Sequence, residues 1–179
     1  LMSADLEALR GNLQELQRVL VAFSGGADSA FLAWVANDTL GPDAVRCYTA
    51  VSPSLAESEL EDCASLAQEW GLNWSPVETT EMDNAAYRVN DSDRCYHCKS
   101  ALMDVVVPFA DEHELIVVLG VNTDDRGDHR PGQSAAQERN ARFPLVEAGF
   151  SKEDVREHSK RLGLRTWDKP AAACLASRI

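Results

Sequence analysis

The stretch that most constrains the fold of this chain is residues 19–29, where an apolar run passes into a glycine turn and then into a helical pattern. Residues 19–23 are short, apolar and rich in valine, which is typical of a buried strand. The run breaks at a Ser-Gly-Gly turn (residues 24–26), and apolar residues at helical spacing begin near Asp28. A strand, a tight turn and a helix N-terminus together form an anion site, because the first helical N–H groups have no partner within the helix.

The residue types of this turn predict a phosphate ligand. Gly25 and Gly26 can take positive φ and leave no Cβ between backbone and phosphate. Ser24 and Ser29 add hydroxyl donors, and Asp28 either caps the helix or helps to hold a magnesium ion. The pattern lacks the lysine of the Walker loop and the third glycine of the dinucleotide fingerprint. The alternative is an ordinary turn, but the complete Ser-Gly-Gly-x-Asp-Ser directly after a strand favours phosphate binding.

Helices and strands are predicted to alternate along the rest of the chain. The predicted helices cover residues 5–17, 28–36, 54–71, 99–106 and 151–162, and the further strands cover residues 44–51, 74–79 and 115–120. Ser54-x-x-Glu57 is predicted as a capping box, and Pro76 as a mark of an edge strand. This order indicates an α/β fold, a parallel twisted sheet with helices on both faces, as one domain over residues 1–179.

Ligands of such sheets bind at the carboxyl ends of the strands. We therefore expect Ser24, Ser52 and the loop of residues 122–132 at one rim of the sheet. That loop is dense in charge and directly follows a buried strand. A carboxylate of Asp124 or Asp125 suits magnesium, and Arg130 suits a substrate carboxylate or phosphate. The alternative is a solvated loop; Lys99 is a weaker candidate cation, and His113 and His158 are predicted to lie on the surface.

Charge and hydropathy restrict the partners. The formal net charge of −12 argues against a surface built for nucleic acid. No apolar stretch approaches the length of about 18 residues that a membrane span needs. The first residues lack the features of a signal peptide, and the cysteine usage suits a reducing compartment. We therefore predict a cytoplasmic protein that binds neither nucleic acid nor membrane.

Three of the five cysteines are candidate metal ligands. Cys95 and Cys98 follow a polar passage and precede a helix, and thiols at i and i+3 suit one metal centre. Cys174 supplies a third thiol, so an iron–sulfur cluster with one open iron, zinc and a redox dithiol are all possible interpretations. His97 is not expected to be a ligand, because a ring between two thiols seldom turns inward with them. The remaining two, Cys47 and Cys63, are predicted to be buried core thiols.

Three segments carry a resemblance to a known family: residues 24–29, residues 122–132, and the tail Pro-Ala-Ala-Ala-Cys-Leu-Ala-Ser-Arg-Ile at 170–179. With these, the chain resembles the LarE-type ATP-dependent sulfur transferases, a branch of the PP-loop ATPases with the adenine nucleotide α-hydrolase-like fold. The resemblance implies that ATP adenylates a carboxylate of pyridinium-3,5-biscarboxylic acid mononucleotide and releases pyrophosphate. A sulfur nucleophile then displaces AMP, as a step in making the nickel-pincer cofactor.

Branches of that family differ in their sulfur source. In one, the cysteine matching Cys174 gives up its own sulfur; in the other, three cysteines hold a 4Fe–4S cluster that delivers an extra sulfide. Cys95 and Cys98 favour the cluster branch. The resemblance thus implies ATP, Mg²⁺ and a 4Fe–4S cluster as cofactors. The nucleotide-binding candidates are Ser24, Gly25, Gly26, Asp28, Ser29, Ser52, Gly120 and Arg130, and the metal candidates are Cys95, Cys98, Cys174 and Asp124.

The family's usual chain continues beyond the residue matching Ile179, and its later part supplies substrate-phosphate contacts and an oligomer interface. We therefore expect a homo-oligomer whose later part this sequence does not include. Rival interpretations are a PP-loop tRNA thiolase, which the negative charge disfavours, and an ammonia-using amidoligase such as NAD synthetase, which leaves three cysteines without a role. A nucleotide- or metal-sensing module without turnover is the alternative outside enzymes.

Overall fold

The computed structural model describes residues 4–51, 55–79, 94–125 and 140–170, with only the backbone described for 94–101. Four strands form one parallel sheet in the order β3-β2-β1-β4. They are β1 (Val19–Ala22), β2 (Val45–Val51), β3 (Trp74–Glu78) and β4 (Ile116–Val118). In the register of the sheet, Val21 of β1 lies between Cys47 of β2 and Val118 of β4. The predicted parallel sheet is confirmed, and β3 with Pro76 lies at its edge, as predicted.

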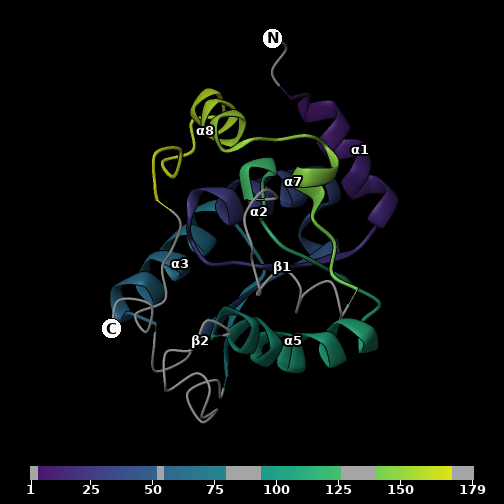
Figure 1. The fold of residues 1–179 in the computed structure, drawn as a ribbon, viewed down its shortest axis with the longest axis vertical. Coiled ribbons are helices and arrows are strands. Elements are labelled where there is room, and N and C mark those ends of the chain that lie inside the picture. The colour runs from purple at the N-terminus through teal and green to yellow at the C-terminus, as the bar shows by residue number, and fades with distance from the viewer. Residues whose placement is uncertain (1–3, 52–54, 80–93, 126–139, 171–179) are drawn as a thin grey trace.

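Helices cover both faces of the sheet, also as predicted (Figure 1). One face carries five helices: α1 (Leu6–Leu16), α2 (Ala27–Leu40), α3 (Glu57–Trp70), α7 (Pro144–Glu147) and α8 (Lys152–Arg161). The other face carries α5 (Arg94–Glu112). Side chains alternate between the two faces along β1. Val19 and Val21 pack in the hydrophobic core under the five helices, and Leu20 packs in the core under α5. Short 3₁₀ turns lie at Pro42–Ala44 and Thr123–Asp125.

The strand order places a switch point beside β1. The chain passes from β1 through α2 to β2 on one side of β1, and returns through α5 to β4 on the other side. Connections leave in opposite directions at such a point, which opens a crevice at the carboxyl ends of the two strands. The glycine turn at 24–26 follows β1, and residues 119–125 follow β4. The topology therefore brings together the two segments that the sequence marks for chemistry.

Two local predictions were wrong. Helix α3 begins at Glu57 with Ala56 as its N-cap, so the capping box predicted at Ser54 does not open it. His158 is 8% exposed, and its Nε2 lies 2.8 Å from the carbonyl oxygen of Ala4. Its ring packs against Phe31 and Phe150, with centroids 6.3 and 5.1 Å away. His158 is buried because it lies on the face of α8 that packs against α2, whatever the charge of its sequence neighbours.

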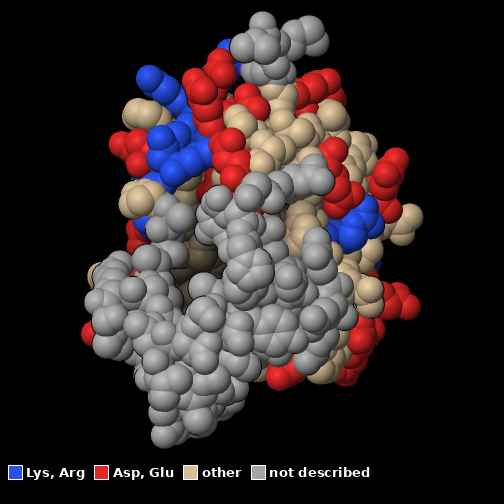
Figure 2. All heavy atoms as spheres, in the orientation of Figure 1, with Lys and Arg blue, Asp and Glu red and all other residues tan. Residues whose placement is uncertain are grey.

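Charge is unevenly spread over the described surface (Figure 2). Acidic side chains are scattered over this face, whereas most of the visible Lys and Arg side chains gather over α8 and the segment after it. Helix α8 packs against α2, and the charges of its Lys152 and Arg156 lower the pKa of Asp28 in the first turn of α2. Across the described ranges, no helix combines the length and apolar character that a membrane crossing requires.

Candidate functional site

The glycine turn after β1 has the conformation that an anion site requires. Gly25 has φ +82°, which a residue with a side chain rarely adopts, and Gly26 is the N-cap of α2. The Ser24 and Ser29 hydroxyl oxygens lie 2.9 Å apart, and the Ser24 N–H donates to Ser29 Oγ over 3.0 Å. These contacts brace the turn, and the first N–H groups of α2 have no partners within the helix, which begins its ladder with the Ala30 N–H and the Gly26 carbonyl.

Two glycines are required by close approach of their neighbours. A Cβ on Gly25 would lie 2.9 Å from Cys63 Sγ and 3.5 Å from Lys169 Nζ. A Cβ on Gly120 would lie 2.8 Å from both the N and Cα of Ser29. Gly120 therefore lets the end of β4 pack directly on the first turn of α2. That contact is a steric role, and the predicted contact of Gly120 with the nucleotide stays a prediction.

Asp28 is held by a side chain from the opposite strand end. Its Oδ2 accepts a hydrogen bond from Asn122 Nδ2 over 2.9 Å, and Asn122 Oδ1 accepts from the Asp124 N–H over 2.9 Å. Asn122 is 2% exposed, and these two hydrogen bonds orient its carboxamide. Burial raises the pKa of Asp28 to about 6, although the Asn122 hydrogen bond opposes that rise. Because Gly26 is the N-cap, Asp28 does not cap α2, and its carboxylate remains available as a magnesium ligand.

Asp124 has a contact that the sequence did not suggest. Its Oδ2 accepts a hydrogen bond from the N–H of Lys152, the first residue of α8, over 2.9 Å. Asp125 instead accepts from the Asn122 N–H over 3.2 Å and, by its charge, raises the pKa of Asp28 further. The carboxylate of Asp124 thus stabilises the start of α8, and its predicted role as a magnesium ligand stays a prediction.

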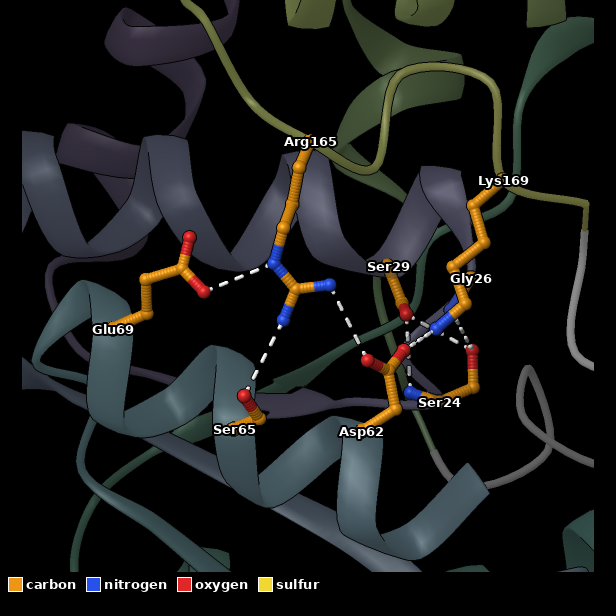
Figure 3. Close-up of polar contacts among 8 residues, drawn as sticks. All are labelled: Ser24, Gly26, Ser29, Asp62, Ser65, Glu69, Arg165 and Lys169. Carbon is orange, nitrogen blue, oxygen red and sulfur yellow. Dashed lines mark hydrogen bonds and ion pairs between the residues drawn. The ribbon is translucent and has the colours of Figure 1, made fainter. Parts of the chain in front are cut away.

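A lysine that no sequence motif marks as a site residue lies at the turn. Lys169 extends from its segment toward Ser24 and Gly26, and its ammonium pairs with Asp62 of α3 (Figure 3). Asp62 also pairs with Arg165, whose Nη1 lies 3.3 Å from Asp62 Oδ1. Burial lowers the pKa of Lys169. Lys169 lies in a coil more than 140 residues after the turn. The one sequence signal for it is its position directly before the tail that contains Cys174.

Several predicted site residues lie outside the described residues: Ser52, Arg130 and Cys174. Cys95 and Cys98 lie one turn apart at the start of α5, without described side chains. Cys47 and Cys63 are buried thiols, as predicted, and burial raises the pKa of Cys47 to about 12. Within the described ranges no cluster of three or more His, Cys, Asp or Glu residues is placed to hold a metal.

Comparisons with known proteins agree with this geometry. The NAD synthase family model matches residues 3–117, which contain the glycine turn and the strands β1 to β3. An uncharacterized protein of Synechocystis is 49% identical over 180 residues, covering 100% of this chain and 67% of that protein. The pyridinium-3,5-bisthiocarboxylic acid mononucleotide synthase of Lactiplantibacillus plantarum is 37% identical over 171 residues. That match covers 93% of this chain but only 61% of the synthase.

A solved structure shows the same fold. The NH3-dependent NAD synthetase of Campylobacter jejuni superposes with a TM-score of 0.72 at 19% identity, over 89% of this chain and 72% of that one. At this identity the likeness shows the fold alone, and it confirms the predicted PP-loop architecture. Because the family model covers well over half of the residues and includes the Ser-Gly-Gly turn that defines the site, the chain belongs to the NAD synthase family of PP-loop proteins.

Proposed function

We propose that this chain is the ATP-using part of a sulfur transferase that adenylates a carboxylate of a pyridinium dicarboxylate mononucleotide and replaces AMP with sulfur. The observation that carries the proposal is the 37% identity to the pyridinium-3,5-bisthiocarboxylic acid mononucleotide synthase across 93% of this chain. That match extends through the region after residue 117, where the NAD synthase family model ends. The reaction belongs, on this proposal, to nickel-pincer cofactor biosynthesis.

The geometry at the switch point supports the adenylation step. The first N–H groups of α2, which lack a side-chain cap, and the hydroxyls of Ser24 and Ser29 suit the phosphates of ATP. The Lys169 ammonium, 3.5 Å from a Cβ position on Gly25, adds a positive charge at the same place. Adenylation is needed because a free carboxylate is a poor electrophile, and AMP is a far better leaving group than oxide.

Magnesium fits the carboxylate at the start of α2. Asp28 is oriented by Asn122 and lies in the first turn, where the phosphates would lie. When bound, the ion would neutralise charge on the transferring phosphates. We propose Asp28 as its principal ligand, with Asp124 as a second. Ser52, Gly120 and Arg130 complete the proposed nucleotide and substrate contacts.

The sulfur step is proposed to depend on Cys95, Cys98 and Cys174 as ligands of a 4Fe–4S cluster. What supports this is the helical one-turn spacing of Cys95 and Cys98 at the start of α5. When bound, the cluster would supply a transferable sulfide. Loss of the Cys174 sulfur itself is the alternative source. We also propose that the protein acts as a homo-oligomer in the cytoplasm.

The test of the adenylation step is pyrophosphate release by the full-length protein with ATP and Mg²⁺. We expect release only when pyridinium-3,5-biscarboxylic acid mononucleotide is added, and thiocarboxylate formation when sulfide is supplied. Ammonia-dependent amide formation would instead identify an amidoligase. Binding of tRNA at moderate salt, with pyrophosphate release that depends on tRNA, would identify a thiolase.

The test of the cluster is anaerobic reconstitution with iron and sulfide. We expect iron–sulfur absorption that is lost in Cys95→Ala and kept in Cys47→Ala, because Cys47 is a buried thiol of β2. Zinc without iron in elemental analysis would contradict the cluster. Conversion of Cys174 to dehydroalanine during turnover, seen by mass spectrometry, would establish the alternative source.

A further inference from the structure

A carboxylate lies beside the one lysine that reaches the glycine turn in the described part of the chain. Asp62 rises from α3 and pairs with the Lys169 ammonium, which itself lies 3.5 Å from a Cβ position on Gly25 (Figure 3). The side chains of Asp62 and Lys169 are 29% and 30% exposed. A carboxylate at a phosphate site repels the ligand and competes for its cation, so its presence there calls for an explanation.

Asp62 is fixed in place by a second cation. Arg165 Nη1 lies 3.3 Å from Asp62 Oδ1, which leaves Oδ2 of the same carboxylate for Lys169. Arg165 is anchored in turn by Glu69, whose Oε2 lies 2.9 Å from Nε, and by Ser65 Oγ at 3.5 Å from Nη2. These three acceptors share one face of α3. The carboxylate is therefore held toward the turn by a contact that does not involve the turn itself.

The Lys169 ammonium needs an anionic partner at this position. Burial lowers its pKa, and the charge of Glu59 opposes that effect. Asp62 is the anionic partner that the structure shows for it. A phosphate at the start of α2 would offer the same ammonium a second partner, because both lie at the Gly25 turn.

We propose that Asp62 is a positioning residue that holds the Lys169 ammonium at the glycine turn and competes with pyrophosphate for it, which weakens the binding of this product and speeds its release. This inference rests on the proposed function, because pyrophosphate is the product of the proposed adenylation. Asp62 acts through Lys169 and does not touch the reacting atoms.

The test is calorimetric titration of the full-length protein with magnesium pyrophosphate. We expect Asp62→Asn to bind it about three- to tenfold more tightly, because no carboxylate then competes with the phosphates for the Lys169 ammonium. Asp62→Glu should return the affinity toward that of the wild type. Asp38→Asn is the matched control: it removes a carboxylate that pairs with Arg10 near the far end of α2, without touching Arg165 or Lys169, and its affinity should be unchanged.

A double-variant cycle separates the role of Lys169 from direct repulsion. Lys169→Met alone should bind pyrophosphate more weakly, and in the Lys169→Met background Asp62→Asn should keep only the smaller gain that comes from direct repulsion. In turnover, Asp62→Asn should strengthen product inhibition by pyrophosphate while the KM for the dicarboxylate stays the same. An unchanged or weaker affinity of Asp62→Asn, or a gain of the same size without Lys169, would overturn the inference.

The inference and the proposed function fail in different ways. If the wild-type protein binds no pyrophosphate and releases none from ATP, both are wrong. If it releases pyrophosphate as proposed but Asp62→Asn behaves as the wild type, only the role of Asp62 is wrong. Thermal unfolding of each variant shows whether a lost affinity reflects a misfolded chain.

Discussion

Asn122 Nδ2 donates a hydrogen bond to Asp28 Oδ2 over 2.9 Å and so joins the end of β4 to the first turn of α2. The two residues come from opposite sides of the switch point. The donor is fixed because Asn122 Oδ1 accepts from the Asp124 N–H. The segment after β4 therefore orients the Asp28 carboxylate and lowers its pKa, against the larger opposite effect of burial.

Replacing Asn122 should raise the pKa of Asp28. The pKa is already raised to about 6 by burial, and the Asn122 hydrogen bond is the largest effect that lowers it. We expect Asn122→Ala to move the pKa above this value, measured by carboxyl ¹³C chemical shifts in magnesium-free buffer. Asp125→Asn should move it in the opposite direction, because the Asp125 charge raises it. Equal shifts in both variants would contradict this account.

The same carboxylate should make stability depend on pH. The native pKa of about 6 exceeds the ordinary value of 3.8, so between these values the native state holds a proton that the unfolded chain releases. Protonated Asp28 makes its whole contribution to the free energy of unfolding below pH 3.8, and that contribution is lost as the pH rises through about 6. Asp28→Asn removes the loss, and we expect about 1–2 kcal/mol more stability than the wild type at pH 7.5, after discounting for partial exposure.

Urea unfolding with a chelator present, at pH 4.5 and pH 7.5, measures this difference. The Asp28→Asn gain should be clear at pH 7.5 and much smaller at pH 4.5. Asp43→Asn, in the exposed 3₁₀ turn before β2, serves as the control and should give no comparable gain at either pH. A gain of equal size at both values would show that the charge of Asp28 is not its cause.

Gly120→Ala should disrupt the crevice by steric contact alone. Its Cβ would lie 2.8 Å from backbone atoms of Ser29, and backbone cannot give way as a flexible side chain can. We expect a loss of roughly 2 kcal/mol or more in the free energy of unfolding, with weaker ATP binding. Gly11→Ala, where nothing lies within 4 Å, should instead be neutral or slightly stabilising in α1. Unfolding curves and nucleotide titrations of the two variants check this.

The sheet, the glycine turn and the buried thiols could be predicted from the sequence because each is written in a short local pattern. Apolar runs predicted β1 and β2, and the Ser-Gly-Gly break placed the turn between β1 and α2. The contacts of Lys169 with Asp62 and of Asn122 with Asp28 could not be predicted, since they join segments about a hundred residues apart. The buried face of α8 packs against α2 and is marked in the sequence only by Val155, three residues before His158, while the surrounding charges hide it.

His158 should therefore matter for stability and not for catalysis. Its ring fills space between Phe31 and Phe150, and its Nε2 bonds the Ala4 carbonyl. We expect His158→Ala to cost roughly 2–3 kcal/mol of unfolding free energy while ATP affinity is kept. His113→Ala is the matched control, because His113 is exposed and packs only along α5 against Phe109 in the described contacts. A loss of ATP affinity in a folded His158→Ala protein would contradict the assignment.

Gly25→Ala should combine backbone strain with a clash at the phosphate site. The residue has φ +82°, and its Cβ would lie 2.9 Å from the buried Cys63 Sγ. We expect a loss of about 1–3 kcal/mol in stability and at least a tenfold loss in ATP affinity.

Gly149→Ala separates the two effects, because Gly149 has φ +77° with nothing within 4 Å of its Cβ position. Gly149→Ala should have a lower free energy of unfolding because of backbone strain, and it should bind ATP as the wild type does. If both variants lost ATP affinity equally, the effect would come from general destabilisation, and the turn at Gly25 would lose its support as the phosphate site.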